Sequence, residues 1–172
     1  MDELLDSIKK YGYFYNVDHK KYWHDKNFVL KSLKYNGLYL KYASKELRND
    51  KEIVHEAVRN YGLALEYASD ELKNDKEIVL EAVKLNIWTL KYASDELRSN
   101  KEIIFNLLKN NGRIFNFISK KFQNDKKLIL VALKNICFVN HIEFKRDNYI
   151  TDNSCYVHFN LKKKFNKILK YY

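Results

Sequence analysis

A 25-residue repeat runs through most of this chain, and it limits the possible folds more than any other feature of the sequence. The similarity is plainest between residues 50–74 and 75–99, which read DKEIVHEAVRNYGLALEYASDELKN and DKEIVLEAVKLNIWTLKYASDELRS. A repeat of this length is one supersecondary unit that cannot bury its apolar face alone, so neighbouring units must stack. The segments that align without a gap are residues 25–49, 50–74, 75–99, 100–124 and 125–149.

Within each unit, the sequence pattern predicts two short helices. Apolar residues recur at helical spacing in Ile53, Val54, Ala57 and Val58, so we expect a first helix from about the second to about the twelfth residue of the unit. A shorter second helix is expected around the motif Leu-x-Tyr-Ala-Ser. The chain has no proline to interrupt these helices. We therefore predict an all-α fold, a solenoid of stacked two-helix repeats with a 25-residue period.

The glycines indicate where the first helix of each unit ends. All of them fall in one column of the repeat, directly after the predicted first helix. A helix that ends in a left-handed residue requires glycine or asparagine there. The column holds Ile87 in one unit and Cys137 in another, and we expect Asn86 to take the left-handed conformation in its unit, or the helix to end differently. The glycines are Gly12, Gly37, Gly62 and Gly112.

The starts of three first helices show capping-box spacing, in which a polar residue precedes a glutamate by three positions. We expect the polar side chain to accept a hydrogen bond from a free backbone N–H group while the glutamate reaches back. The pairs are Asn49 with Glu52, Asn74 with Glu77, and Ser99 with Glu102.

The ends of the chain differ from its centre, as expected for a stacked array whose end units must face water. Residues 1–24 read as a degenerate first unit, residues 25–149 as five repeats, and residues 150–172 as a closing helix. A chain of 172 residues is long enough for one core and too short for two ordinary domains. We expect a single helical-repeat domain over residues 1–172.

The pattern D-K-E-I-V-L-E-A-V-K-x-N-G/I-x-x-L-x-Y-A-S-D-E-L-R resembles the short repeats of domain-of-unknown-function family 4116. The resemblance covers residues 25 to about 136 and is closest over residues 50–99. It implies a helical repeat but no activity, because the family is functionally uncharacterised, and no catalytic residue is carried over. Such repeats occur in amoeba-associated bacteria, protists and large DNA viruses of amoebae, so the resemblance also implies a viral or intracellular-parasite origin.

The net charge of +10 is unevenly distributed along the chain. Residues 50–74 carry three basic and six acidic side chains, and residues 75–99 carry four and five, whereas residues 25–49 and the C-terminal third are basic. A solenoid that binds nucleic acid is expected to carry a continuous basic stripe. The interruption favours a protein partner and leaves nucleic acid, bound through the basic ends, as the alternative.

One column of the repeat is nevertheless basic in every unit. Stacking would place these cations in a row, about 10 Å apart, where they could bind phosphates or an acidic protein surface. The alternative explanation is structural, because a cation in the last turn of a helix is favoured by the helix dipole. The column consists of Lys9, Lys34, Arg59, Lys84, Lys109 and Lys134.

The column after the glycine varies between units, and a surface that varies is a better indicator of recognition than one that merely repeats. An exposed Trp88 would be an anchor for a partner, and Arg113 takes the same position one unit later. The alternative is that Trp88 fills core space between units. The column reads Tyr13, Leu38, Leu63, Trp88, Arg113 and Phe138.

The C-terminal segment is basic and amphipathic, with Leu161, Phe165, Ile168 and Leu169 on one helical face. Such a helix can lie on an anionic membrane or contact nucleic acid. The alternative is a closing helix with a solvated face. The lysines of this basic tail are Lys162, Lys163, Lys164, Lys167 and Lys170.

Two Cys/His pairs are weak candidates for zinc ligands. Cys137 with His141 and Cys155 with His158 have spacings that can place each pair on one helical face. Nothing else in the sequence supports a metal site, and we predict no metal and no cofactor.

Sequence motifs of enzymes are absent: there is no glycine-rich phosphate loop, no nucleophile–base pattern and no HExxH. We therefore predict a protein–protein interaction module of the adaptor or inhibitor type and no enzyme, with an enzyme on a helical-repeat scaffold as the third hypothesis. Two cysteines, no secretory signal and no apolar segment of about 20 residues favour an intracellular, cytoplasmic protein of the source cell or of a viral host.

Overall fold

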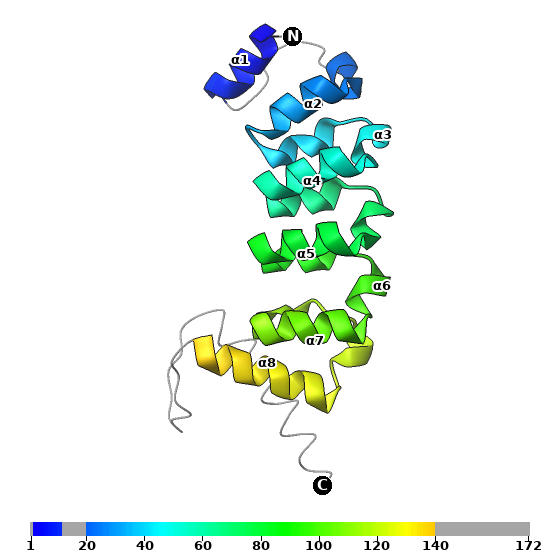
Figure 1. The fold of residues 1–172 in the computed structure, drawn as a ribbon, viewed down its shortest axis with the longest axis vertical. Coiled ribbons are helices and arrows are strands. Elements are labelled where there is room, and N and C mark those ends of the chain that lie inside the picture. The colour runs from blue at the N-terminus through cyan, green and yellow to red at the C-terminus, as the bar shows by residue number, and fades with distance from the viewer. Residues whose placement is uncertain (1, 12–19, 140–172) are drawn as a thin grey trace. The chain divides into compact units, whose positions relative to one another are not determined.

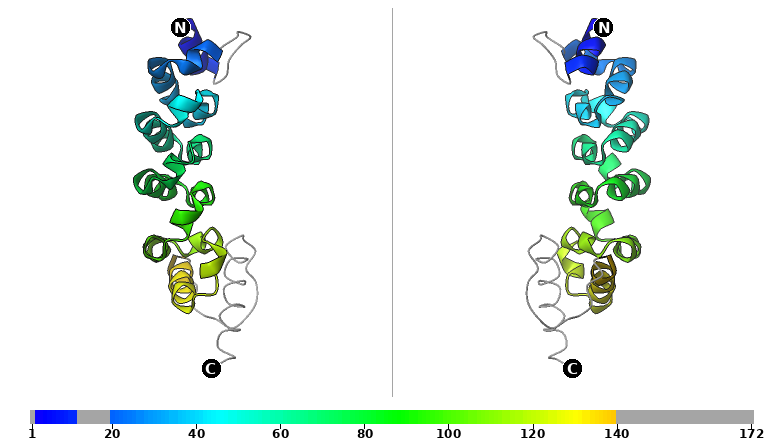
Figure 2. Two further views of the ribbon diagram at one scale, coloured as in Figure 1. Left: turned by 90° about the vertical axis from the view of Figure 1, so that its right-hand side faces the viewer. Right: turned by 90° about the vertical axis from the view of Figure 1, so that its left-hand side faces the viewer.

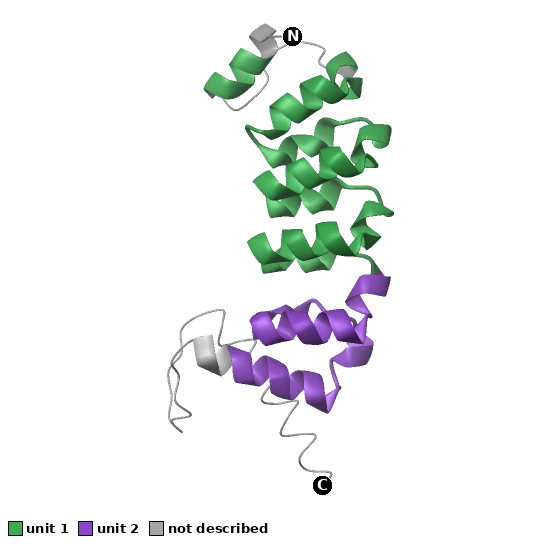
Figure 3. Cartoon of the chain, viewed as in Figure 1, with its two compact units in different colours: residues 1–94 green, residues 95–172 purple. Residues whose placement is uncertain are grey.

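The computed structural model describes residues 2–11 and 20–139, which form helices joined by short turns and contain no strand (Figure 1). The all-α prediction is thus confirmed for these residues. The chain divides into two compact units, Met1–Ser94 and Asp95–Tyr172, which we call unit 1 and unit 2 (Figure 3).

The helices recur in a regular order along the chain. The α-helices are α1 (Asp2–Tyr11), α2 (Lys26–Leu33), α3 (Lys45–Arg48), α4 (Lys51–Asn60), α5 (Lys76–Leu85), α6 (Asp95–Arg98), α7 (Lys101–Asn110) and α8 (Lys126–Val139). The 3-10 helices are η1 (Lys20–His24), η2 (Gly37–Tyr42), η3 (Gly62–Tyr67), η4 (Leu72–Asn74), η5 (Ile87–Tyr92), η6 (Gly112–Asn116) and η7 (Lys120–Phe122).

Unit 1 is built of two layers of helices with the core between them (Figure 2). Helices α2, α4 and α5 pack side by side in one layer, and η2, η3 and η5 form the other. The apolar side of α4, with Ile53, Val54, Ala57 and Val58, is fully buried, as is Leu65 of η3. In unit 2, α7 packs against α8, and both contact η6. The predicted apolar stripes therefore form the core.

The second helix of each unit is a short 3-10 helix. In three repeats an asparagine side chain caps the start of this 3-10 helix. Asn36 accepts a hydrogen bond from the N–H of Leu38, Asn86 from that of Trp88, and Asn111 from that of Arg113. Such a side chain mimics a backbone turn and favours a tight start over continuation of the preceding helix. This asparagine therefore separates the two helices of a unit.

The first helix ends without a left-handed residue. Tyr61 and Asn86, which end α4 and α5, both have φ −151°, an extended conformation. The expectation that Asn86 would be left-handed is therefore wrong, and so is the left-handed explanation of Gly37 and Gly62, which begin η2 and η3 at an ordinary φ.

Close packing between consecutive 25-residue repeats explains Gly37 and Gly62 instead. A Cβ atom at Gly37 would lie 2.2 Å from the carbonyl oxygen of Ala57, and one at Gly62 would lie 2.9 Å from that of Ala82. Both distances are shorter than any real contact of a Cβ atom. The starts of η2 and η3 therefore touch the backbone of the next first helix, and at these two positions only glycine leaves enough room.

The helix N-caps lie one residue later than predicted. Asp50 accepts hydrogen bonds from the N–H groups of Glu52 and Ile53, and Asp75 makes the equivalent pair in α5. The capping boxes expected at Asn49, Asn74 and Ser99 are therefore wrong. Asn49 and Asn74 instead accept hydrogen bonds from the hydroxyl groups of Ser69 and Ser94, each of which lies in the following repeat. Asn100 caps α7 in the same way that Asp50 caps α4.

A backbone hydrogen bond joins consecutive repeats at the serine of each Tyr-Ala-Ser motif or its equivalent. The serine N–H donates to a carbonyl of the preceding repeat, so the link does not depend on the side chains of either partner. The bonds are Ser44 to Trp23 at 2.9 Å, Ser69 to Arg48 at 2.9 Å, Ser94 to Lys73 at 3.0 Å, and Ser119 to Arg98 at 3.1 Å.

An ion-pair ladder follows the starts of the first helices. Each first helix from α2 onward begins with lysine, and in α2, α4 and α7 the ammonium group of this lysine reaches the aspartate that precedes the next first helix. The N–O distances are 2.8 Å for Lys26 with Asp50 and 2.9 Å for Lys51 with Asp75. Lys101 pairs with Asp125 in the same way within unit 2. Lys26 and Lys51 also reach Glu52 and Glu77 at 2.7 and 3.1 Å.

The ladder shifts the pKa values of its aspartates in the direction of pairing. Partial burial raises the pKa of Asp50 and Asp75, but the lysine hydrogen bonds and the backbone N–H groups outweigh it and leave both below their ordinary value. The hydrogen bond from Lys101 is the largest cause of the lowered pKa of Asp125. The charged aspartates are thus favoured by the fold, and this contribution to stability is lost as the pH falls through their lowered pKa values.

Replacing the packed glycines by alanine is expected to destabilise the protein. Gly37→Ala should lower the free energy of unfolding by about 1–3 kcal/mol, because the added methyl group overlaps a carbonyl oxygen, and Gly62→Ala should cost less because its contact is longer. Urea unfolding followed by circular dichroism measures both. Asparagine at either position serves as the control: it would be tolerated at a left-handed position, so stable asparagine variants would contradict the packing explanation.

Replacing a capping aspartate by asparagine is expected to separate capping from ion pairing. Asp75→Asn keeps the cap, as Asn100 does naturally, but loses the pair with Lys51, so its stability should fall less than that of the parent protein on acidification below about pH 4. Asp75→Ala loses the cap as well and should be less stable at neutral pH by about 1 kcal/mol. Thermal unfolding from pH 2 to pH 7 makes the comparison. Identical pH profiles for the parent and Asp75→Asn would show that the pair contributes nothing.

Candidate functional site

The ends of α2, α4 and α5 lie along the same edge of unit 1 (Figure 1). This follows from the repeat, because each first helix begins at the ion-pair ladder and runs across the unit in the same direction. Basic and apolar side chains are exposed together there. We call this surface the helix-end edge, and it consists of Lys34, Tyr35, Arg59, Tyr61, Lys84, Leu85 and Trp88.

Most of the exposed large apolar side chains of the described residues belong to this edge. The exposed fractions are 48% for Tyr35, 43% for Tyr61, 56% for Leu85 and 55% for Trp88. Isolated exposed apolar residues are common, but a group of them on one surface indicates an interaction site. Trp88 thus meets the condition of exposure on which the anchor hypothesis depends, and the alternative that it fills core space between repeats is wrong.

The close packing at Gly37 and Gly62 holds two of these side chains against the preceding repeat. The ideal Cβ position at Gly37 lies 3.0 Å from the Cβ atom of Tyr61, and that at Gly62 lies 3.3 Å from the Cβ atom of Leu85. Tyr61 and Leu85 therefore stand beside the start of the neighbouring 3-10 helix. The close packing of the backbones thus brings apolar side chains of consecutive repeats onto one edge.

The cations of the edge have few opposite charges near them. Lys34, Arg59 and Lys84 are all exposed. Among the described residues neither lysine forms an ion pair, and Arg59 only approaches Glu56 on its own helix, at 3.8 Å. Segments 33–38, 58–63 and 83–88 contain no carboxylate. The edge therefore presents a positive potential, which the carbonyl groups at the helix ends reduce but do not cancel.

The two edges of unit 1 use charge differently. At the helix starts, lysines and aspartates of consecutive repeats neutralise one another in the ladder, as Lys51 and Asp75 do. At the helix ends, Lys34 and Lys84 form no ion pair among the described residues, and Arg59 lies 3.8 Å from Glu56 of its own helix. The helix-start edge is therefore satisfied within the protein, whereas the helix-end edge has charge available for a partner.

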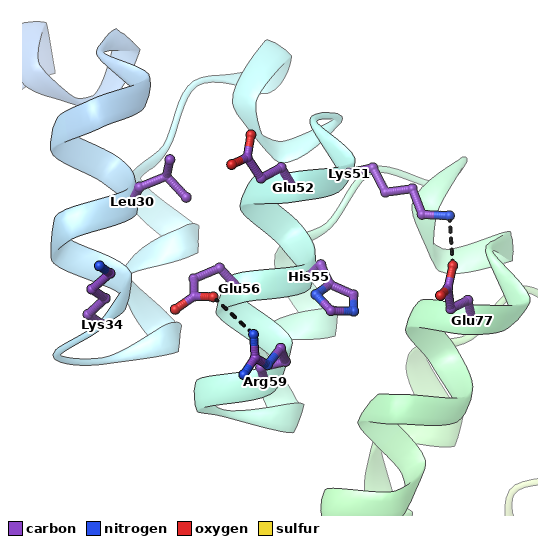
Figure 4. Close-up of a pocket in the computed structure, with 8 residues that line it drawn as sticks. All are labelled: Leu30, Lys34, Lys51, Glu52, His55, Glu56, Arg59 and Glu77. Atoms are coloured by element: carbon purple, nitrogen blue, oxygen red, sulfur yellow. Dashed lines mark hydrogen bonds and ion pairs between the residues drawn. The ribbon is translucent and has the colours of Figure 1, made fainter.

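A pocket of about 610 Å³ opens on the first-helix layer next to this edge (Figure 4). Lys34 and Arg59 line it, so two residues of the predicted basic column do come together. His55 Nε2 lies 2.7 Å from Glu81 Oε2. The lining contains three cations and three carboxylates, so it does not select a ligand by net charge. It consists of Leu30, Lys34, Lys51, Glu52, His55, Glu56, Arg59 and Glu77.

Lys109 and Lys134 of the basic column and Arg113 of the variable column lie in unit 2. Arg113 is half-buried at the start of η6, and Lys109 stands over the ring of Phe105, 4.7 Å from its centre. Arg59, Lys84 and Lys109 lie in the last turn of their helices, where the helix dipole favours a cation. Lys134 does not, because α8 continues to Val139. The dipole therefore explains part of the column and not all of it.

Several predicted features lie outside the described residues: the basic tail at Lys162, Lys163, Lys164, Lys167 and Lys170, and the histidines and cysteine at His141, Cys155 and His158. Cys137 belongs to α8, but its side chain is outside the description as well. The described part of the chain holds no group of three or more His, Cys, Asp or Glu side chains that could bind a metal ion. Nor is any helix in that part long and apolar enough to cross a membrane.

Comparison with known proteins places this geometry in a family. Residues 25–64, 50–98 and 100–144 each match the family described as Domain of unknown function (DUF4116). No curated protein and no solved structure matches the chain. The three matches overlap the helical repeats and together span more than half of the chain, so the resemblance inferred from the repeat motif is confirmed: the chain belongs to the DUF4116 family.

Proposed function

We propose that this chain is a protein-interaction module, of the adaptor or inhibitor type, whose repeats stack as a solenoid with a 25-residue period and bind a partner protein through the helix-end edge. The observation that carries the proposal is that exposed apolar side chains lie on the same edge of unit 1 as three exposed cations, of which Lys34 and Lys84 form no ion pair among the described residues. Apolar anchors within a polar rim are typical of protein interfaces, and tryptophan, tyrosine and arginine are enriched where binding energy concentrates.

Binding is better supported than catalysis. The pocket beside the edge contains His55, paired with Glu81, but no serine, threonine or cysteine lines it. The histidine therefore has no nucleophile to activate at that place. A rigid array of short helices that carries an exposed apolar row is, in contrast, a suitable support for a binding surface.

Nucleic acid is less well supported as the partner. Three cations lie along the edge, but residues 50–74 carry six acidic side chains against three basic ones. A phosphate backbone requires a larger positive field, and its binding would weaken steeply with salt. The apolar residues of the edge can pack against apolar side chains of a protein, which a phosphate backbone lacks.

Removing the two most exposed apolar side chains is expected to abolish partner capture. In a pull-down from lysate of the source cell, or of its host, Leu85→Ala with Trp88→Ala should capture at most about a tenth of the partner that the parent protein retains, because anchor residues cost 2 kcal/mol or more when truncated. The melting temperature should hardly change, since both side chains are exposed.

Leu130→Ala is the matched control, because Leu130 is an exposed leucine of α8 that lies outside the edge. Its capture should equal that of the parent protein. Equal capture by the double variant and the parent protein would refute the edge as the binding surface. Partners lost after nuclease treatment would point to nucleic acid.

A further inference from the structure

The helix-end edge carries two parallel rows of side chains, and their spacing limits what can bind. Lys34, Arg59 and Lys84 form a cationic row, one residue from each first helix of unit 1. Tyr35, Tyr61 and Leu85 form an apolar row directly beside it. Because α2, α4 and α5 pack as neighbours, consecutive members of a row are separated by one helix-packing distance, about 8–10 Å.

This spacing matches one turn of an extended peptide. A polyproline II helix has three residues per turn and rises about 3.1 Å per residue, so every third side chain points the same way at intervals of about 9 Å. Such a peptide presents one row of side chains to the cations. The next row along its surface faces the apolar residues of the edge.

We infer that the partner contributes an extended segment with a carboxylate at every third position and an apolar residue after each carboxylate. The inference rests on the proposed function and adds the chemistry of the ligand to it. Three charges in register with Lys34, Arg59 and Lys84 form three ion pairs at once, while the apolar residues cover Tyr35, Tyr61 and Leu85. Segments 33–38, 58–63 and 83–88 contain no carboxylate, and Lys34 and Lys84 form no ion pair among the described residues, so both are open to acidic side chains of a partner. Arg59 would exchange its 3.8 Å contact with Glu56 for one with the partner.

Synthetic peptides test the register directly. A fluorescein-labelled peptide with three Asp-Leu-Ser triplets should bind the full chain, as measured by anisotropy at low salt. A peptide of the same composition with its three aspartates consecutive should bind roughly tenfold more weakly, because it cannot meet all three cations. Equal affinity of the two peptides would overturn the inference, since simple charge attraction would explain both.

Variants of the edge test the residues. Lys34→Gln with Arg59→Gln and Lys84→Gln should lower the affinity of the register peptide by roughly tenfold. Lys45→Gln with Lys76→Gln and Lys91→Gln removes the same charge from other exposed positions of unit 1 and should change it less than twofold, by roughly the effect expected of screened distant charges. Circular dichroism spectra of both triple variants should match the parent protein. An equal loss in the two triple variants would overturn the inference.

Two competitors distinguish other occupants. A helical peptide with aspartates seven residues apart places its charges about 10 Å apart on one face, and tighter binding of that peptide would replace the extended partner by a helical one. A single-stranded oligonucleotide that displaces the register peptide at equal charge would identify the row as a phosphate site. If no peptide binds but Leu85→Ala with Trp88→Ala still abolishes capture of the native partner, the register is wrong and the proposed function stands.

Discussion

Close contact between the backbones of consecutive repeats is the constraint on which this structure depends. The starts of η2 and η3 press against the next first helix, closely enough at Gly37 that a Cβ atom would lie 2.2 Å from the carbonyl oxygen of Ala57. The serine N–H group then bonds to the preceding repeat, as Ser69 does to Arg48. Neither contact uses a variable side chain. The side chains outside the core are therefore free to differ between repeats without loss of the stacking.

The same stacking of repeats also determines where charged side chains lie in unit 1. A first helix begins next to the start of its neighbour, so a lysine at the first position reaches the neighbour's capping aspartate, as Lys51 reaches Asp75. Each aspartate thus serves its own helix as a cap and the preceding helix as an ion-pair partner. At the other end the dipole favours a cation, and Arg59 and Lys84 satisfy it. No capping anion is needed at a helix end, so the cations there meet few carboxylates: Arg59 approaches Glu56 at 3.8 Å, and Lys84 forms no ion pair among the described residues.

The sequence predicts the elements of this fold well and some of their atomic roles poorly. The repeat and the apolar spacing correctly predict helices such as Lys51–Asn60 and their buried side chains. The glycine column was explained by a left-handed cap, because a free backbone angle and a close neighbour both select glycine and the sequence of one unit does not contain its neighbour. The caps were misplaced by one residue because Asn49 and Asp50 are both good caps. The lysine at the second position of every repeat, present at Lys26 and Lys51, is a sequence signal of the ladder that the sequence analysis does not use.

The candidate site was likewise only partly predictable, because the sequence of one repeat does not show what its neighbour covers. The basic column and Trp88 were identifiable from the sequence, but Tyr35, Tyr61 and Leu85 were not, because exposure depends on where the next repeat ends. Tyr61 and Leu85 occupy neighbouring positions of the unit and not the same one, so a search for identical columns passes over them. Selection for stacking keeps a column constant, whereas selection for a surface requires only an exposed apolar side chain near the helix end. The row is apolar in three consecutive repeats of unit 1 yet uneven in residue type and register, and this unevenness supports the proposed contact with a partner over contact between repeats.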